Sequence, residues 1–511
     1  MENENAAIWF VDRHLSEGRG DKVAFREADG KKRTLTYGQL AEETARFAGA
    51  LVRHAVRRDE RVAMIVRDQL EFPVVFWGAL KAGAIPVPLN TLLAAPVYEA
   101  ILNDSRASIL VVSQALWDSV KPAVEGNRFL RTVLVIGDAP EGTESYQAFV
   151  GDAEALAPAE AHGDELAFWL YSSGSTGTPK GVRHVHASLK ATADTFGRGV
   201  LGIREDDIVF SVAKMFFAYG LGNAMSFPMS VGATTVIFSG RPTPETVLGI
   251  MAEQGPTVFC GVPTLFAAAV AEQEKVGTKP KHSIRICTSA GEALPREIGE
   301  RWEKLWGSPI IDGVGSTEML HIFLSNAPGD IVYGTSGLPV PGYEVRLVDE
   351  HDEDVADGEV GELLVRGPSS AEGYWNRRHK SMSTFQGHWT RTGDKYQRDQ
   401  NGRFVYCGRT DDMFKVSGIW VSPFEVEQAL VEHPSVLEAA VVAKADAEDL
   451  VKPAAFIVLK QGAEAPDEAA LKELVKARIG MWKYPRWIEV VDDLPKTATG
   501  KIQRFMLRGN G

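Results

Sequence analysis

The sequence YSSGSTGTPKG at residues 171–181 decides the fold, and it directly follows the apolar run ELAFWL at residues 165–170. An apolar run that ends in a glycine-rich loop predicts a strand. Gly174 and Gly177 permit backbone angles and close approaches that a Cβ atom would prevent. The hydroxyl and N–H groups of the loop can then face phosphate oxygens, with positive charge from Lys180. We therefore predict a loop that binds a polyphosphate.

The spacing of this loop separates it from other phosphate-binding loops. A Walker A loop has the pattern GxxxxGK followed by Ser or Thr, and it leads into a helix. Here Thr178 and Pro179 stand between the glycine and the lysine, and Gly181 follows the lysine. A P-loop NTPase is therefore disfavoured. A plain glycine-rich linker is disfavoured as well, because this ordered motif follows an apolar strand.

The composition indicates a globular chain of more than one domain. A chain of 511 residues exceeds what one hydrophobic core normally serves. Apolar residues make up 44% of it and charged residues 24%, which is ordinary for a globular protein in water. The 68 acidic and 55 basic residues give a net charge of -13, which argues against a broad nucleic-acid-binding surface. Local positive groups must therefore hold any anionic ligand.

The cysteines and the apolar runs bear on the location of the protein. Cys260, Cys287 and Cys407 lie far apart without a CxxC spacing, so neither a disulfide framework nor a zinc site is expected. The N-terminal residues lack a basic segment, and Lys81 and two prolines interrupt the apolar stretch 72–89. We therefore expect neither a signal peptide nor a membrane span, and a cytoplasmic protein.

Strand and helix patterns alternate in the first half of the chain. Residues 62–66, 109–112 and 132–136 read as strands and residues 72–82 as a buried helix. This order predicts an α/β fold with mostly parallel sheets that are covered by helices.

The pattern changes after residue 341. Short alternating strands follow, and Asn401-Gly402 is a hairpin signal, so we expect a β-rich subdomain there. The last hundred residues carry their own strands at 439–443 and 454–459 and a helix at 468–479. We predict a large N-terminal domain at residues 1–410 and a small α+β C-terminal domain at residues 411–511.

The loop at 171–181 resembles the signature of the adenylate-forming (ANL) superfamily, which includes acyl- and aryl-CoA ligases, firefly-type luciferases and the adenylation domains of peptide synthetases. Four further motifs, spread over most of the chain, are similar to motifs of the same superfamily. They are SAGEAL at 289–294, GVGSTE at 313–318, WTRTGD at 389–394 and PKTATGK at 495–501. The resemblance implies ATP, Mg2+ and coenzyme A as cofactors, and a C-terminal domain that is mobile.

Nucleotide contacts are implied for three parts of the chain. Asp394 would accept both ribose hydroxyls, since a carboxylate has two acceptor oxygens, and Arg409 would contact the ribose or a phosphate. Val314 departs from the family, which usually has an aromatic residue there against the adenine ring. The remaining nucleotide-binding residues are Ser172, Ser173, Gly174, Ser175, Thr176, Gly177, Thr178 and Lys180 in the loop, and Ala290, Gly291, Glu292, Asp312 and Gly313 around the adenine.

The resemblance assigns catalytic roles to three residues. Thr317 would touch the α-phosphate, Glu318 would hold Mg2+, and Lys501 would bridge the substrate carboxylate and the α-phosphate. A carboxylic acid with a pKa near ~4 is already ionised at pH 7, so the attack on phosphorus needs no general base. Asp411 would be the hinge of the C-terminal domain, and Gly418 would admit the pantetheine arm of coenzyme A.

The stretch AKMFFAYGLGN at 213–223 resembles the benzoate-CoA ligase branch. Aromatic residues could form a flat apolar slot for a ring, and small residues could leave room at its edges. The residues implied are Phe217, Ala218, Tyr219, Phe227, Gly315, His321 and Ile322.

The leading expectation is an ATP-dependent ligase that makes an aryl-CoA, in particular benzoyl-CoA, through an acyl-AMP. Two alternatives stay open: an adenylating enzyme that loads a carrier protein or acts on a medium-chain fatty acid, and a nucleotide-binding protein without catalysis. A homodimer is left open. A lysine acetyltransferase that acts on Lys501 is left open as well, and acetylation there is expected to switch the enzyme off because it would remove the charge.

Overall fold

A computed structural model describes residues 3–173, 179–278, 280–416, 419–446, 450–480, 483–496 and 502–508. The chain forms two compact units. Unit 1 comprises Met1–Val345 and Val365–Arg391, and unit 2 comprises Arg346–Leu364 and Thr392–Gly511. The units are described separately below, and the predicted boundary at residues 410–411 stays a prediction.

The largest sheet of unit 1 has nine strands in the order β16-β15-β14-β13-β12-β10-β11-β1-β2. Its central strands are parallel, and β2, β15 and β16 are antiparallel to their neighbours. The strands are β1 (Val23–Glu27), β2 (Thr34–Thr36), β10 (Ile208–Ser211), β11 (Thr234–Ile237), β12 (Val258–Gly261), β13 (Ile286–Ser289), β14 (Ile310–Gly315), β15 (Ile322–Ser325) and β16 (Leu338–Pro339).

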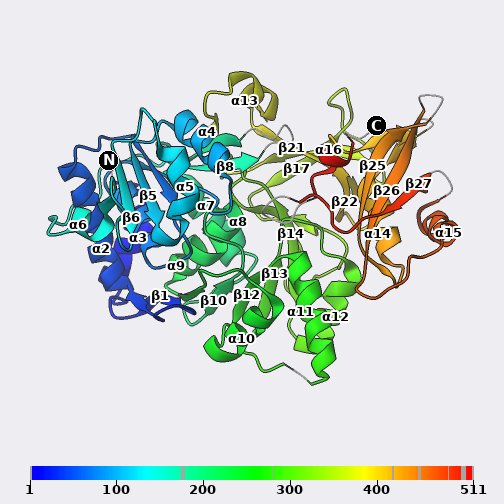
Figure 1. The fold of residues 1–511 in the computed structure, drawn as a ribbon, viewed down its shortest axis with the longest axis horizontal. Helices are drawn as coiled ribbons and strands as arrows, with labels where there is room; N and C mark the ends of the chain where they lie inside the picture. Colours follow the sequence, from blue (N-terminus) through cyan, green and yellow to red (C-terminus); the bar gives the residue numbers. More distant parts are fainter. Residues whose placement is uncertain are drawn as a thin grey trace. The chain divides into compact units, whose positions relative to one another are not determined.

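Helices α10 (Pro244–Gln254), α11 (Pro263–Val276) and α12 (Arg296–Trp306) bury their apolar residues against this sheet (Figure 1). Phe266 of α11 and Trp302 of α12 pack on Phe259 of β12. Both sheet faces need such cover because parallel strands are apolar on both sides.

A second, parallel sheet of unit 1 has the order β4-β3-β5-β6-β7. Its strands β3 (Arg61–Ile65), β5 (Ile109–Ser113) and β6 (Thr132–Ile136) confirm the three strands expected from the sequence, and α3 (Glu71–Lys81) confirms the helix. The α/β fold with parallel sheets is therefore confirmed. The other elements of this region are η1 (Ile8–Asp12), α1 (Arg13–Ser16), α2 (Tyr37–Arg53), β4 (Ile85–Pro88), α4 (Ala95–Ser105), η2 (Gln114–Leu116), α5 (Trp117–Val124), β7 (Glu144–Ser145) and α6 (Tyr146–Val150).

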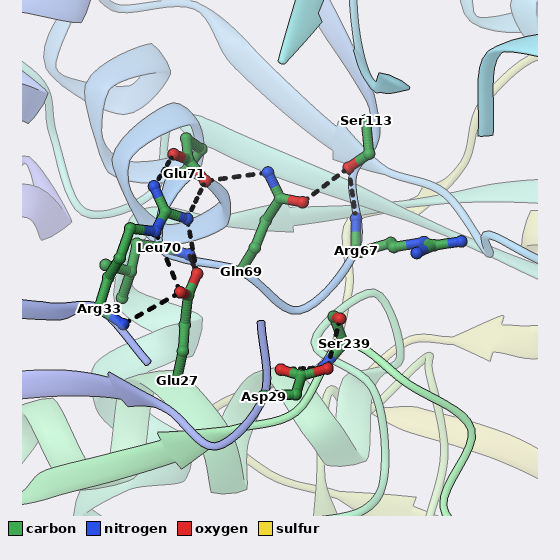
Figure 2. A network of polar contacts seen from close by, with 9 residues as sticks. All are labelled: Glu27, Asp29, Arg33, Arg67, Gln69, Leu70, Glu71, Ser113 and Ser239. Atoms are coloured by element: carbon green, nitrogen blue, oxygen red, sulfur yellow. Dashed lines mark hydrogen bonds and ion pairs between the residues drawn. The ribbon is translucent and has the colours of Figure 1, made fainter. Parts of the chain in front are cut away.

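Arg33 ties the two large sheets of unit 1 together (Figure 2). Its guanidinium donates to the carboxylate of Glu27, at the end of β1, and to that of Glu71, in the first turn of α3. Gln69 extends the network, since it donates to Glu71 and accepts from Ser113 at the end of β5. Planar two-pronged contacts of this kind fix geometry as well as charge, so the two sheets keep one relative orientation here.

A third, small sheet of unit 1 holds the glycine-rich loop. Strands β8 (Leu166–Ser173) and β9 (Pro179–Val185) form an antiparallel pair, and β19 (Gly373–Tyr374) adds to β9. The chain continues into α7 (His186–Thr192) and η3 (Ala193–Arg198), and later into α8 (Ala218–Leu221), η4 (Gly222–Ser226) and α9 (Phe227–Val231). Near β19, α13 (Arg378–Thr384) precedes β20 (Phe385–Gln386). Both η3 and η4 are π-helical turns, which often occur at functional sites.

Unit 2 contains a β-rich part and the C-terminal segment. Strands β17 (Glu344–Val348), β18 (Gly361–Arg366), β21 (Trp389–Arg398) and β22 (Phe404–Arg409) follow one another in a sheet, and the hairpin expected at Asn401-Gly402 joins β21 to β22. Gly402 has φ +78°, as such a turn requires. The C-terminal segment consists of β23 (Phe414–Val416), β24 (Ile419–Val421), α14 (Pro423–Val431), β25 (Val436–Ala445), β26 (Val451–Leu459), α15 (Glu468–Ile479), β27 (Trp487–Val490) and α16 (Arg504–Leu507).

The C-terminal segment has a core of its own, in which α14 and α15 pack on β25 and β26. Among the described helices of the whole chain, none combines the length and the hydropathy of a membrane-crossing helix.

Candidate functional site

The register of β8 and β9 fixes both ends of the glycine-rich loop. Ser172 pairs with Lys180 and Ser173 with Pro179, so the two strands are paired up to the residues that flank 174–178. Five predicted phosphate contacts of this loop lie outside the described residues. They are Gly174, Ser175, Thr176, Gly177 and Thr178.

Lys180 lies against an aromatic ring that the sequence analysis did not select. Its Nζ is 4.7 Å from the centroid of the Tyr374 ring. Tyr374 stands opposite Val182 in the pairing of β19 with β9. Residues two apart on a strand face the same side, so Lys180, Val182 and Tyr374 share one face of this small sheet.

The predicted catalytic pair Thr317 and Glu318 lies in the turn after β14. Three successive carbonyls of this turn accept hydrogen bonds from other segments. His184 Nε2 lies 2.8 Å from Thr317 O, Ala371 N donates to Glu318 O at 2.9 Å, and Ser369 Oγ donates to Met319 O at 2.7 Å. The course of the turn is therefore set by β9, which follows the glycine-rich loop, and by the segment 369–371.

The carboxylate of Glu318 has a defined partner. Tyr374 donates its hydroxyl hydrogen to Glu318 Oε1 at 2.7 Å. Within the described part of the chain, no three His, Cys, Asp or Glu side chains gather into a metal site. A single carboxylate fits Mg2+, because this ion is usually held by one or two carboxylates together with substrate phosphates. Glu318 therefore fits the predicted magnesium role as a ligand that shares the ion with ATP.

His184 is neutral and acts through one nitrogen. Burial lowers the pKa of His184 to about 4. Its ring stacks on Phe168, at 5.2 Å between centroids. The carbonyl of Thr317 can only accept, so Nε2 carries the hydrogen and donates it. Nδ1 is then an acceptor, and it has no hydrogen-bond partner among the described residues.

The predicted adenine-side residues come from two neighbouring strands of the large sheet. Ala290, Gly291 and Glu292 directly follow β13, and Asp312 and Gly313 belong to β14. Ser289 at the end of β13 pairs with Asp312, which brings the two segments side by side. Gly291 has φ +97°, a conformation that favours glycine.

Asp312 is buried, and burial raises its pKa to about 8. Leu294 N lies 3.4 Å from Oδ2, whereas Oδ1 has no hydrogen-bond partner among the described residues. A buried acceptor without a partner costs free energy, and a ligand with an N–H group could supply that partner.

The glycines of β14 are required by its close approach to β15. A Cβ atom on Gly313 would lie 2.7 Å from Leu324 O, and one on Gly315 would lie 2.5 Å from His321 O. The register shifts between Val314 and Gly315, where the strand bends towards the turn at 317–319.

Most predicted aryl-binding residues gather around the ring of His321. The ring centroid of His321 lies 4.4 Å from that of Phe227 and 5.6 Å from that of Tyr219. Ile322 is its chain neighbour and is buried. Tyr219 is fixed at its other end, because its hydroxyl lies 2.9 Å from Thr288 O and 3.1 Å from Gly261 O. Helix α8 begins at Ala218, and Phe217, which directly precedes it, packs on Phe216.

His321 is buried and neutral, since burial lowers its pKa to about 3. Its Nε2 lies 3.3 Å from Tyr219 O, so Nε2 carries the hydrogen. Nδ1 has no hydrogen-bond partner among the described residues. The cluster also includes Phe196 of η3, whose centroid lies 5.2 Å from that of His321 and which the sequence analysis missed.

Asp394 and Arg409, the predicted ribose contacts, pair with each other in unit 2. They stand opposite in the pairing of β21 with β22, and Arg409 Nη1 donates to Asp394 Oδ1 at 2.8 Å. The Asp394 carboxylate raises the pKa of Arg409 above its usual range, which keeps the guanidinium charged.

Asp411 is exposed, and its carbonyl accepts from Arg508 at 3.1 Å. Lys501 and Gly418 lie outside the described residues, so their roles stay predictions.

The residues that sequence reasoning missed carry weak local signals. Strand periodicity from Lys180 places His184 on the same face, which could have pointed to it. Tyr374 has no comparable signal, because its position depends on pairing between strands about two hundred residues apart.

Two family descriptions match the chain. AMP-binding enzyme matches residues 12–375, and AMP-binding enzyme C-terminal domain matches residues 425–501. The chain is 50% identical over 513 residues to a 4-hydroxybenzoate–CoA/benzoate–CoA ligase of Rhodopseudomonas palustris, which covers 99% of this chain and 94% of the relative. It is 49% identical over 514 residues to a benzoate–CoA ligase of Thauera aromatica, which covers 99% and 96%.

Solved structures agree with these relatives. A benzoate CoA ligase from Burkholderia xenovorans LB400 superimposes with a TM-score of 0.91 at 48% identity, over 99% of this chain and 100% of the other. The anthranilate CoA ligase AuaEII in complex with anthranoyl-AMP superimposes with a TM-score of 0.93 at 41% identity, over 99% and 96%. The fold, the motifs and these matches establish that the chain belongs to the AMP-binding enzyme family of adenylate-forming proteins.

Proposed function

We propose that the protein is an ATP-dependent aryl-CoA ligase that converts benzoate or a close aromatic carboxylate to its CoA thioester. The acid is first joined to AMP with release of pyrophosphate, and the thiol of coenzyme A then displaces AMP. The observation that carries the proposal is that Lys180 and Glu318 both contact Tyr374, and that Glu318 lies three residues before His321, whose ring packs against aromatic rings. The names of the 50% and 49% identical relatives support it.

The first step needs positive charge rather than a base. The acid is ionised at pH 7, since its pKa is near ~4, so a carboxylate oxygen can attack the α-phosphorus once repulsion is reduced. The bond from phosphorus to the bridging oxygen breaks, and pyrophosphate leaves with the electron pair. Lys180, Thr317 and Lys501 would hold the phosphates and the carboxylate in place. Mg2+ held by Glu318 and ATP phosphates would neutralise charge on the leaving group.

The second step needs a different arrangement of the C-terminal residues. Lys501 must act on the α-phosphate in the first step, and the pantetheine thiol must reach the same carbonyl in the second. We propose that Asp411 is the hinge between these arrangements, and that Gly418 gives the narrow arm of coenzyme A room to pass. The thiol loses its proton to solvent as the sulfur–carbon bond forms and AMP departs.

Nucleotide recognition is assigned to both units. In unit 1, Asp312 Oδ1 could accept from the adenine amino group, and Gly291 could let the backbone lie close to the base. In unit 2, Asp394 would accept from the ribose hydroxyls. Its ion pair with Arg409 keeps the carboxylate oriented for that task.

The ring cluster supports an aromatic acid as the substrate. Tyr219, Phe227 and His321 offer flat faces and edges against which a ring can pack. A neutral His321 does not attract a second carboxylate, and its Nδ1 is a buried acceptor without a described partner. A hydroxyl group on the substrate ring could donate to it. We therefore propose benzoate and hydroxybenzoates as the substrate class.

The proposal extends to location and regulation. We place the enzyme in the cytoplasm, a compartment that keeps thiols reduced, and all three cysteines of the chain are buried free thiols. Acetylation of Lys501 by a lysine acetyltransferase would remove its charge and stop adenylation. A homodimer would be compatible with this chemistry, because each chain carries every proposed catalytic group.

A panel of acids tests the proposed function. Purified protein is given ATP, Mg2+, coenzyme A and benzoate, hydroxybenzoates, anthranilate or octanoate, and AMP release is followed. We expect CoA-dependent AMP release with the aromatic acids. AMP release with octanoate but with none of the aromatic acids would contradict the proposed aryl slot. Pyrophosphate exchange that depends on the acid but never yields a CoA thioester would favour the loading of a carrier protein.

Lys501→Ala tests the two-step scheme. We expect the variant to lose benzoate-dependent pyrophosphate exchange and to retain thioester formation from supplied benzoyl-AMP and coenzyme A, because the lysine acts in the first step. Lys496→Ala, outside the proposed machinery but near Lys501 in sequence, is the control. Equal loss of both half-reactions in the Lys501 variant would overturn the scheme.

A further inference from the structure

Tyr374 contacts two groups of opposite charge at the candidate site. Its hydroxyl donates to Glu318 Oε1 at 2.7 Å, and the centroid of its ring lies 4.7 Å from Lys180 Nζ. A phenol that donates to a carboxylate forms a charge-assisted hydrogen bond. An ammonium group over a ring is attracted by the negative charge of the ring face. One side chain therefore contacts both a proposed metal ligand and a proposed phosphate ligand.

The position of Tyr374 is fixed from several sides. Its side chain is 4% exposed and packs with Val182, Ala371 and Phe385. Its backbone N–H donates to Ser381 Oγ at 2.9 Å. The next residue, Trp375, donates its backbone N–H to Gly181 O at 2.8 Å, which holds β19 against the strand that follows the phosphate loop. The ring cannot move without disturbing the strand that carries Lys180.

The segment around Tyr374 also holds the backbone of the turn with Glu318. Ala371 N donates to Glu318 O, and Ser369 Oγ donates to Met319 O. The backbone and the carboxylate of Glu318 are therefore both held by the segment 369–374. The same segment is paired with β9. Movement of either the lysine strand or the glutamate turn must act on Tyr374.

We propose that Tyr374 is a positioning residue that aims the Glu318 carboxylate and the Lys180 ammonium at one metal–nucleotide complex. This inference rests on the function proposed above. The hydrogen bond to Oε1 restrains the rotation of the carboxylate, so that Oε2 is presented in one orientation. Groups that orient a metal ligand in this way typically change metal affinity by roughly 10-fold to 100-fold when they are removed.

The test compares the affinity of wild type and Tyr374→Phe for Mn2+·ATP, measured from the electron paramagnetic resonance signal of free Mn2+. Phenylalanine keeps the ring over Lys180 and removes the donor to Glu318. We expect the dissociation constant to rise by roughly 10-fold. Tyr37→Phe is the matched control, because Tyr37 is also buried and its hydroxyl donates to Ala233 O at 2.7 Å, away from the site.

A double-variant cycle separates positioning from general loosening of the fold. In a Glu318→Gln background, Tyr374→Phe should change the Mn2+·ATP affinity by less than 2-fold, because the charged partner of the hydroxyl is gone. An equal loss in both backgrounds would overturn the proposal, and so would an unchanged affinity in Tyr374→Phe. Thermal melts of all variants identify any that are not folded at the assay temperature.

Tyr374→Leu tests the contact with Lys180. Without divalent metal, in the presence of EDTA, ATP affinity should be preserved in Tyr374→Phe and should fall several-fold in Tyr374→Leu, because only leucine removes the ring face. Equal ATP affinity of the two variants would overturn this part. If wild type makes no aryl-CoA but Mn2+·ATP binding depends on Tyr374, the proposed function fails and this inference stands. If wild type makes aryl-CoA but Tyr374→Phe binds Mn2+·ATP as tightly as wild type, the proposed function stands and this inference fails.

Discussion

The turn at residues 317–319 and the ring cluster around His321 are neighbours in the chain but are held in different ways. The turn is held by hydrogen bonds to three successive carbonyls and to the Glu318 carboxylate. The ring cluster is formed mainly by packing of aromatic rings, and the Tyr219 hydroxyl adds hydrogen bonds to two backbone carbonyls. The Nδ1 atom of His321 in this cluster has no hydrogen-bond partner among the described residues. Oriented hydrogen-bond dipoles stabilise charge at the turn, whereas side chains in close contact define the shape of the ring cluster.

The largest expected effect comes from removing the charge of Glu318 in the turn at 317–319. Glu318→Gln keeps the size of the side chain and removes the charge that would hold Mg2+. We expect benzoate-dependent pyrophosphate exchange to fall by roughly 100-fold to 1000-fold, which corresponds to several kcal/mol of lost charge stabilisation. Benzoate binding, measured by calorimetry without ATP, should not change.

The matched control for this variant is Glu300→Gln on α12, where the carboxylate forms an exposed ion pair with Arg296. Exposed ion pairs of this type contribute little. If both variants keep wild-type exchange rates, Glu318 has no metal role.

An intermediate effect should come from disturbing the packing of the ring cluster around His321. A Cβ atom on Gly222 would lie 2.5 Å from His321 Cδ2 and 2.9 Å from Phe227 Cζ, so Gly222→Ala must displace the rings. Overpacking of this kind costs roughly 1–3 kcal/mol. We expect the KM for benzoate to rise by roughly 10-fold to 100-fold, with the KM for ATP unchanged.

Gly249→Ala provides the matched control for the packing prediction. Gly249 lies inside α10, and a Cβ atom there would meet nothing within 4 Å. Alanine favours a helix over glycine, so this variant should be as active as wild type and slightly more stable. An equal rise in the KM values for ATP and benzoate in Gly222→Ala would mean that the two regions are not separable.

The smallest effect concerns acidity. Burial lowers the pKa of His184, which holds the turn, to about 4, and that of His321, in the ring cluster, to about 3. A histidine in the unfolded chain has a pKa near ~6.5. Between these values the unfolded chain binds a proton that the folded chain does not bind. The free energy of unfolding therefore falls as the pH falls below ~6.5, by at most about 1.4 kcal/mol per pH unit for each residue.

Urea unfolding at pH 7.5 and pH 5.5 measures this effect. His321→Asn should reduce the loss of stability between the two pH values by roughly 1 kcal/mol relative to wild type. A pH dependence that is the same in wild type and in His321→Asn would show that His321 does not titrate on unfolding.

Local periodicity was enough to predict several regular elements of unit 1. The strand predicted at 62–66 is found at Arg61–Ile65, and the helix predicted at 72–82 is found at Glu71–Lys81. Both predictions succeed because the spacing of apolar residues in a long run indicates a strand or a helix. Lys180, which the sequence predicts within the loop at 171–181, lies in strand β9, and Thr317 and Glu318 lie in the turn after β14. Their roles, and that of Lys501, stay predictions.

Long-range pairing and local irregularity limited the rest. Tyr374 contacts Lys180 and Glu318, which are distant from it in sequence. The local sequence around Tyr374 does not predict either contact. Phe196 lies in the π-helical turn η3, and η4 precedes Phe227. A π-turn adds a residue to a helical turn, so it shifts side chains to positions that a 3.6-residue period does not predict.

The attachment of the turn at 317–319 through its carbonyls has a consequence for protein engineering. Every amino acid supplies the same carbonyl, so libraries that randomise side chains in this turn would keep its three tethers. Alternative metal ions or nucleotides could be selected at these positions on an unchanged backbone.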